Sequence, residues 1–182
     1  MKTTNIRIPK DRIGVVIGDK GSTKKRIEKR TGCTMDIDSN TGEIEVDTSK
    51  IEDPLIELKV LDVIKAIGRG FSPVKALKIL NDDYYFEIID IKSYVGRSSK
   101  AVKRMKGRVI GREGRTRQLI EELSESFIAV YGHTVCIIGP PTEMAVARKA
   151  VQMILEGSEH GAVYSYLESK RPEIKRDKLG FF

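Results

Sequence analysis

Aromatic side chains are scarce in this sequence of 182 residues, which has no tryptophan and only 6% phenylalanine and tyrosine. Many proteins that bind single-stranded nucleic acid stack the bases on several aromatic rings. A broad platform of that kind needs more aromatic residues than this chain supplies. The sequence therefore disfavours aromatic stacking as the main mode of binding a nucleic acid.

Long apolar runs are also missing. The longest stretch without a charged residue, residues 126–142, has 17 residues and is interrupted by Gly132, Pro140 and Pro141. It is too short and too broken for a transmembrane helix. Five charged residues lie within the first 12 positions, which excludes the apolar core of a signal peptide there. We therefore expect a cytoplasmic protein with no membrane partner.

Residues that bind metals or act as nucleophiles are few and scattered. Neither Cys33 nor Cys136 belongs to a CxxC pair, and such cysteines are typical of buried thiols in a reducing compartment. His133 and His160 have no cysteine, serine or carboxylate at a spacing typical of a catalytic or metal site. The sequence therefore predicts no enzyme activity, no catalytic residues, no metal, no cofactor and no small-molecule substrate.

Positive charge is in excess and unevenly distributed. The net charge is +7. Residues 7–30 hold nine basic and three acidic residues, and residues 98–118 hold eight basic residues and one acidic residue. The rest of the chain carries a net negative charge. Basic segments of this kind indicate a polyanionic partner, and their concentration in two places favours nucleic acid over a membrane surface.

The two basic segments contain two copies of one motif. Residues 14–28 read GVVIGDKGSTKKRIE and residues 107–121 read GRVIGREGRTRQLIE, with eight identities in 15 positions and a constant offset of 93. Self-similarity of this density indicates two copies of one structural module. The residues around both copies predict the same order of elements: strand, helix, glycine loop, helix, strand, strand, helix.

The two modules place the expected elements along the chain. In the first copy, strands are expected near residues 4–8, 33–37 and 44–46, and helices near residues 10–17, 22–30 and 55–67. In the second copy, strands are expected near residues 84–91, 127–130 and 135–138, and helices near residues 99–110, 115–124 and from 141 onward. Residues 72–80 predict a short connecting helix, and residues 92–98 a polar insertion.

These patterns divide the chain into four parts. We expect a first domain at residues 1–71, a connecting helix and linker at 72–83, a second domain at 84–157, and a C-terminal helix with a basic tail at 158–182. The last helix is expected to end near Lys170, with a frayed tail behind it. The apolar residues of this tail are candidates for docking a protein partner, or ordinary flexible residues: Leu179, Phe181 and Phe182.

Each module centres on a GxxG loop between two helices. Glycine at both ends permits backbone conformations closed to other residues and lets a ligand backbone approach closely. The following helix presents unpaired N–H groups and the positive end of its dipole, which suits a phosphate. A single GxxG is often only a turn between helices, but two matching copies favour binding. The motif lacks the features of a Walker loop and of a dinucleotide fingerprint.

The first copy resembles KH domains. Ile8-Pro9, residues 13–21 and residues 31–35 follow the pattern of that family almost throughout. The resemblance implies an α+β fold with two type I KH domains, each a three-stranded antiparallel sheet with three helices on one face, plus the C-terminal helix. It also implies that each GxxG loop clamps about four nucleotides of a single strand.

The resemblance also implies two sets of contact residues. The RNA-binding set is Gly18, Asp19, Lys20, Gly21, Lys24, Lys25, Arg108, Gly111, Arg112, Glu113, Gly114, Arg115 and Arg117. The set lining an aliphatic groove is Ile17, Ile27, Met35, Ile37, Ile110, Ile120, Ile128 and Val130, most of which are also ordinary core candidates. The family pattern has an apolar residue where Lys24 and Arg117 stand. A basic residue there either adds a contact with the nucleic acid or faces solvent.

The second copy narrows the resemblance. With its arginine-rich residues 108–117 and two KH modules filling the chain, the sequence resembles the ribosome-biogenesis KH proteins, the archaeal relatives of the eukaryotic pre-rRNA-processing protein partner of Nob. This implies binding of single-stranded RNA near the 3′ end of small-subunit rRNA. The implied protein partner is an rRNA-maturation endonuclease or another ribosome-assembly protein. Two alternatives stay open: an RNA-binding subunit of an RNA-degrading complex, and a protein-interaction scaffold with KH folds.

Overall fold

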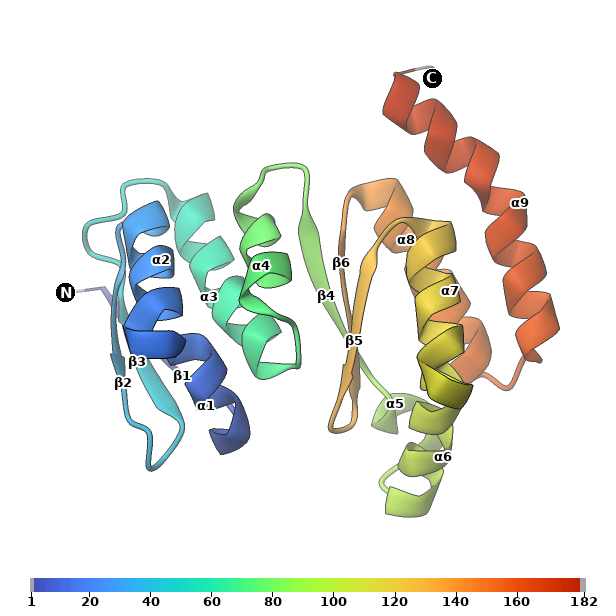
Figure 1. Ribbon diagram of the computed structural model, residues 1–182, viewed down its shortest axis with the longest axis horizontal. Coiled ribbons are helices and arrows are strands. Elements are labelled where there is room, and N and C mark those ends of the chain that lie inside the picture. Colours follow the sequence, from blue (N-terminus) through green and yellow to red (C-terminus); the bar gives the residue numbers. More distant parts are fainter. Residues whose placement is uncertain (1, 181–182) are drawn as a thin grey trace. The chain divides into compact units, whose positions relative to one another are not determined.

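Each half of the chain builds a three-stranded antiparallel sheet with helices on one face, as the computed structural model shows (Figure 1). The structure describes residues 2–180. Contacts within the chain group it into two units, which meet in the sequence at Asp82 and Asp83. The expected fold class, two KH-like α+β units followed by a C-terminal helix, is confirmed.

The first unit has the expected order of elements. They are β1 (Thr3–Arg7), α1 (Lys10–Ile17), a 3₁₀ turn (Asp19–Gly21), α2 (Ser22–Thr31), β2 (Thr34–Ile37), β3 (Glu43–Asp47), α3 (Pro54–Gly68), α4 (Pro73–Ala76) and a second 3₁₀ turn (Leu77–Leu80). The strand order is β1-β3-β2. The pairing sets Ile6 opposite Ile44 and Met35 opposite Val46, so the buried side chains form one face of the sheet.

The helices of the first unit begin and end where local chemistry favours it. Asp53 caps α3 by accepting a hydrogen bond from the Leu55 N–H, and Pro54 occupies the first helical turn. Gly32, with φ of 84°, ends α2. The expected connecting helix is present as α4 and the 3₁₀ turn that follows, and it packs against α3.

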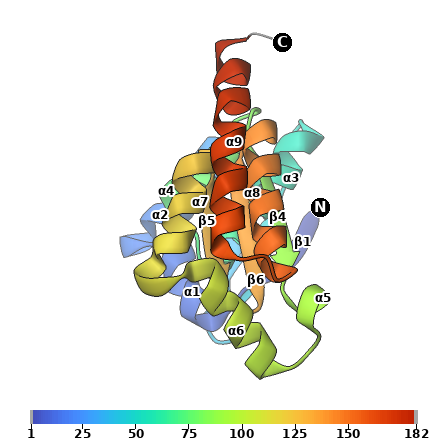
Figure 2. The ribbon, with the colours of Figure 1, turned by 90° about the vertical axis from the view of Figure 1, so that its right-hand side faces the viewer.

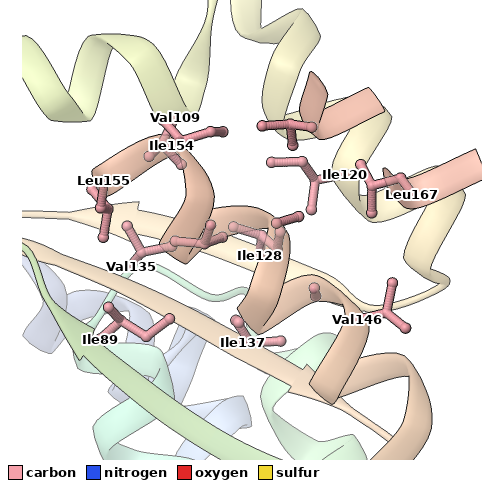
Figure 3. Close-up of a cluster of buried hydrophobic side chains, with 14 of the residues drawn as sticks. Ile89, Val109, Ile120, Ile128, Val135, Ile137, Val146, Ile154, Leu155 and Leu167 are labelled. Atoms are coloured by element: carbon pink, nitrogen blue, oxygen red, sulfur yellow. The ribbon is translucent and has the colours of Figure 1, made fainter. Parts of the chain in front are cut away.

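The second unit repeats this order with additions. Its elements are β4 (Tyr85–Asp90), α5 (Lys92–Val95), α6 (Ser99–Ile110), a 3₁₀ turn (Arg112–Gly114), α7 (Arg115–Ser124), β5 (Phe127–Tyr131), β6 (Thr134–Gly139), α8 (Pro141–Leu155) and α9 (His160–Leu179). The strand order is β4-β6-β5. Isoleucine, valine and leucine side chains from the strands and from α6, α7, α8 and α9 form one buried cluster (Figure 3).

Residues 92–98, expected to be a polar insertion, are exposed or half-buried and contain the helical turn α5, which follows the buried Ile91. One sequence prediction in this unit was wrong. The predicted frayed tail after Lys170 is instead helical as far as Leu179, with Pro172 inside α9. The helix continues because Ile174, 1% exposed, belongs to the core of the unit. Phe181 and Phe182, named as docking candidates, lie outside the described residues.

Figure 2 shows α9 lying alongside α7 and α8. Side-chain contacts connect its C-terminal end to the rest of the second unit. The Asp177 carboxylate accepts a hydrogen bond from the Thr142 hydroxyl, and the Lys178 ammonium forms an ion pair with Glu125. Lys178 Nζ also lies 4.0 Å from Oε1 of Glu143. Burial, together with the nearby Asp177, raises the pKa of Glu143 above its ordinary value.

The buried Glu143 carboxyl gives a pH prediction. Because its pKa is higher in the folded than in the unfolded chain, the folded state holds the proton more tightly. We expect the free energy of unfolding to fall as the pH rises above the ordinary glutamate pKa of 4.5 and the carboxyl ionises. Glu143→Gln should remove this part of the pH dependence, as measured by urea unfolding at several pH values. Identical slopes for the two proteins would contradict the prediction.

Candidate nucleic-acid interface

The two glycine loops have the same backbone conformation. Gly18, Lys20 and Gly21 have φ angles of 73°, 50° and 76°. The corresponding residues of the second loop, Gly111, Glu113 and Gly114, have φ angles of 75°, 53° and 74°. Three of the four residues in each loop therefore have a positive φ, although the middle residues differ in charge. The sequence repeat thus reflects one loop built twice.

The first glycine of each loop is required by close packing as well as by its backbone angle. A Cβ atom on Gly18 would lie 2.6 Å from the backbone nitrogen of Thr23. A Cβ atom on Gly111 would lie 2.8 Å from the backbone nitrogen of Thr116. Both threonines are buried and recur in the sequence repeat. Each threonine is the second residue of the helix that follows its loop, so the first glycine packs against the start of that helix.

Each loop leads directly into a ten-residue helix, α2 or α7. The residue before each helix is a glycine, and it provides no side-chain cap. The first N–H groups of the helix, with the positive end of its dipole, therefore point toward the loop without a capping side chain from that residue. The middle residues of both loops are exposed: Asp19, Lys20, Arg112 and Glu113. A phosphate can approach both loops from solvent.

The basic residues behind the loops differ in their surroundings. Lys25 and Arg115 are exposed, and Lys24 is half-buried. Arg117, the counterpart of Lys24 in the second copy, donates from Nη1 to Oε2 of Glu121 at 2.9 Å. In the second unit, the basic residue that replaces the apolar residue of the family pattern is therefore paired with a glutamate of its own helix, α7.

The glutamate of the repeat has a role that the sequence analysis missed. Glu28 accepts a hydrogen bond from the backbone N–H of Met35, and Glu121 accepts one from the N–H of Ile128, each at 2.8 Å. Met35 lies in β2 and Ile128 in β5, which are edge strands. Each carboxylate thus connects the helix behind the loop to the edge strand of its sheet. The recurrence of the glutamate in both copies was the signal for this role.

Burial divides the predicted groove residues into two groups. The first group is packed in the cores at 0–2% exposure: Ile27, Met35, Ile120 and Ile128. Figure 3 shows Ile120 and Ile128 within the buried cluster of the second unit. The second group is half-buried and reaches the surface: Ile17, Ile37, Ile110 and Val130. Only the second group has side-chain surface available to a ligand.

Arg108, predicted among the RNA-binding residues, is held by backbone carbonyls. Its Nη1 donates to the carbonyl of Ile154 at 2.8 Å, and its Nη2 donates to the carbonyl of Ser158. His160 Nε2 donates in turn to the Arg108 carbonyl at 2.8 Å. These bonds connect α6 with the end of α8 and the start of α9.

A second arginine makes the same kind of connection in the first unit. Arg12 on α1 donates from Nε to the carbonyl of Ile67 at 2.8 Å and from Nη2 to that of Phe71 at 2.9 Å. Both carbonyls lie at the end of α3 or just after it. Arg12 and Arg108 do not align in the repeat. The two units therefore bond an arginine to backbone carbonyls in the same way but from different sequence positions.

Groups able to do metal or nucleophilic chemistry do not converge near the loops. Among residues 2–180 no group of three histidine, cysteine, aspartate or glutamate side chains is placed to hold a metal ion. Cys33 is buried, and burial raises the pKa of its thiol, which keeps it protonated near neutral pH. His133 Nδ1 lies 2.9 Å from Oδ1 of Asp90. No helix in the same range is long and apolar enough to span a membrane.

Comparison with protein families matches both units. Residues 3–52 match the KH domain family model. Residues 85–172 match the model of the eukaryotic-type KH domain (KH-domain type I) in the form found as the second KH domain of PNO1. The second match includes most of α9, which has no counterpart in the first unit.

Similar proteins come from archaea and yeast. The chain is 46% identical over 174 residues to a KH domain-containing protein of Methanocaldococcus jannaschii, covering 96% of this chain and 76% of the relative. It is 29% identical over 142 residues to the pre-rRNA-processing protein PNO1 of Candida glabrata, covering 78% of this chain and 54% of that protein.

A solved structure shares both sequence and fold with the chain. It is described as the complex of a/eIF2alpha, aDim2p and rRNA from Pyrococcus horikoshii OT3. The matched chain is 48% identical and superposes with a TM-score of 0.86, covering 94% of this chain and 95% of that one.

Proposed function

Because this chain belongs to the tandem KH proteins of the PNO1 type, we propose that it binds single-stranded RNA through its two GxxG loops. The observation that carries this proposal is that both loops have one backbone conformation, are exposed, and lie at the uncapped start of a helix. A loop of this kind holds the sugar–phosphate backbone, and the aliphatic surface beside it receives the bases.

The charges around the loops support binding of a polyanion. In the first unit Lys20, Lys24 and Lys25 flank the loop, and in the second Arg112 and Arg115 do so. These residues would neutralise several phosphates of an RNA bound at the loops, which makes the affinity fall steeply with salt. The half-buried groove residues then discriminate bases by shape and apolar contact, because aromatic rings are few.

The relatives indicate where the RNA comes from. One relative is a pre-rRNA-processing protein, and the Pyrococcus structure contains rRNA and a/eIF2alpha. We infer that this chain is a small-subunit ribosome-assembly factor in the cytoplasm and acts near the 3′ end of small-subunit rRNA. Its protein partners are then a ribosome-assembly protein such as the maturation endonuclease, or a translation-initiation factor subunit. In this assignment the chain positions RNA, and a partner carries out the cleavage.

Substitutions in the loops test the proposal. We expect Arg112→Asp with Glu113→Asp to lower the affinity for a single-stranded oligonucleotide from the 3′ end of small-subunit rRNA about tenfold or more, roughly 1.4 kcal/mol. Lys20→Asp should weaken binding by the first loop in the same way. Aspartate tolerates the left-handed conformation of the loop better than most residues, so the fold should persist. Fluorescence anisotropy at moderate salt measures the affinity.

Two controls separate the loop contact from a general loss of charge. Lys50→Asp in the first unit and Lys175→Asp on α9 change exposed lysines away from the loops. Both should leave the affinity nearly unchanged. If a variant with both loops altered binds the oligonucleotide as tightly as the unaltered protein does, the proposed function is wrong.

A further inference from the structure

The second unit contains a basic pocket of about 520 Å³ away from the GxxG loop. It lies between α5, the N-terminal half of α6 and the turn that joins β5 to β6. Its lining includes Lys92, Arg97, Val102, Lys103, Lys106 and His133. None of the roles assigned above uses this pocket.

The charges of the pocket favour an anion. Four of its lining residues are lysine or arginine, and no carboxylate lines it. The nearest acid along the chain, Asp90, is engaged at the rim, where it bonds to His133 Nδ1 and accepts from the Lys92 N–H at 2.9 Å. A concave surface with charges of one sign concentrates ions of the other sign.

The pocket also offers apolar surface. Val102 contributes to its lining, and it is mostly covered by neighbouring residues. The methylene stems of Lys103 and Lys106 add further apolar contact beside their charged ends. A phosphate alone would use only the cationic groups. A nucleotide, which joins a phosphate to a sugar and a flat ring, would use both kinds of surface.

Residues of the pocket and of the predicted RNA groove lie on one face of α6. Lys103, Lys106 and Ile110 are spaced at i, i+3 and i+7 and therefore share one face of the helix. Ile110 is the half-buried groove residue that directly precedes the loop. The eight steps from Lys103 to Gly111 correspond to about 12 Å along the helix axis at 1.5 Å per residue. A strand held at the loop can run along this face and enter the pocket.

The first unit provides an internal comparison because it lacks this arrangement. With the repeat offset of 93, Lys106 corresponds to Ile13, which is 3% exposed and lies in the core. The helix α1 begins at Lys10, four residues later than α6 in the alignment of the repeat. No helix corresponding to α5 lies between β1 and α1. The pocket is therefore an addition to the second copy of the module.

We propose that this pocket holds a nucleotide of the same RNA strand, beyond the four nucleotides at the GxxG loop of the second unit. The inference rests on the proposed RNA-binding function and extends it. It assigns the additional helix α5 and the lengthened α6 a role in reading a longer stretch of RNA than a KH domain clamps alone.

Oligonucleotides of two lengths test this inference. The full chain carrying Lys20→Asp, which weakens the first loop, is titrated with a tetranucleotide and a decanucleotide from the 3′ end of small-subunit rRNA. We expect Arg97→Glu with Lys103→Glu to lower the affinity for the decanucleotide about tenfold, and that for the tetranucleotide less than twofold. Both side chains are exposed, so the fold should not change.

A matched control comes from the same helix. Lys100→Glu with Arg104→Glu makes the same change of charge at exposed positions of α6 that do not line the pocket. These changes should affect the two oligonucleotides equally and by less than the pocket variant affects the decanucleotide. If the pocket variant behaves like this control, the pocket does not contact RNA and the inference is overturned.

The outcomes separate the pocket from the loops. If Arg112→Asp with Glu113→Asp still lowers the affinity about tenfold or more while the pocket variant has no length-dependent effect, the inference fails and the proposed function stands. If neither variant affects either oligonucleotide, the proposed function fails. Titration with AMP and with inorganic phosphate forms a further arm. The pocket variant could remove saturable binding of AMP or phosphate and leave the decanucleotide affinity unchanged. That result would assign the pocket to a free ligand and overturn the RNA inference.

Discussion

Replacing Gly111 by alanine is expected to destabilise the second unit by about 3 kcal/mol. A residue other than glycine held at the φ of 75° and ψ of 175° of Gly111 is strained by roughly 1–3 kcal/mol, because this region is essentially closed to side chains. Inserting an extra methyl group into a close-packed site costs about 1–3 kcal/mol more. Here the new Cβ would lie 2.8 Å from the backbone nitrogen of Thr116, and backbone cannot move aside as a flexible side chain can.

Gly107→Ala is the matched control for this prediction. Gly107 lies one turn earlier in α6, where a Cβ atom meets nothing within 4 Å. Alanine in a helix interior is favoured over glycine by roughly 0.5–1 kcal/mol, so this variant should be more stable than the unaltered protein. Urea unfolding measures both changes, and hydrogen exchange resolved by peptide assigns them to the second unit. Stability changes of the same sign in the two variants would contradict the packing argument.

Replacing Arg108 by alanine is the other substitution with a large expected effect. Its guanidinium donates two hydrogen bonds to the carbonyls of Ile154 and Ser158. Hydrogen bonds to charged groups contribute about 1.5–3 kcal/mol each, although the Ile154 carbonyl keeps its bond from the Gly157 N–H. Because such terms overlap, we expect a loss of about 3 kcal/mol for the pair. RNA affinity measured well below the melting temperature should change little, since the guanidinium is occupied within the fold.

Arg104→Ala and Arg108→Lys complete this test. Arg104 is exposed one turn earlier on the same helix, so its removal should change the stability by less than about 0.5 kcal/mol. Lysine at position 108 lacks the planar fork that reaches two carbonyls together and should restore only part of the loss. Thermal unfolding followed by circular dichroism compares the three variants. An Arg108→Ala protein of normal stability with weakened RNA binding would return Arg108 to the RNA-binding set.

Local sequence signals predicted most of the fold because the chain carries the same module twice. Alternating apolar residues, caps and glycines located the strands and helices independently in each copy. Both copies predicted the same order of elements. The end of α9 was missed because Pro172 is a local signal against a helix. The contact that overrides it, the burial of Ile174 in the core, involves residues far away in the sequence. At the end of α9, tertiary packing therefore outweighs the local tendency of the sequence to end the helix.

The candidate site was predicted less completely. The spacing of the glycines located both loops, whose backbone is a local property. Which predicted groove residues are buried in the core and which reach the surface depends on the packed fold. Ile17 and Ile27, for example, are both apolar residues of the helices around the loop. Only the structure shows that one reaches the surface and the other does not. The carbonyl partners of Arg108 lie 46 and 50 residues away in the chain, beyond the reach of any local pattern.

The bonds from Glu28 and Glu121 to the edge strands bear on the thermodynamics of recognition. Each joins the helix that starts at a GxxG loop to the edge strand of its sheet, β2 or β5. The helix begins at the loop and the edge strand carries the half-buried groove residue Ile37 or Val130, so one carboxylate in each unit sets the separation of loop and strand during folding. An RNA strand that enters the groove then meets walls that are already in place. Less conformational entropy is lost on binding than if helix and strand had to be brought together by the ligand itself.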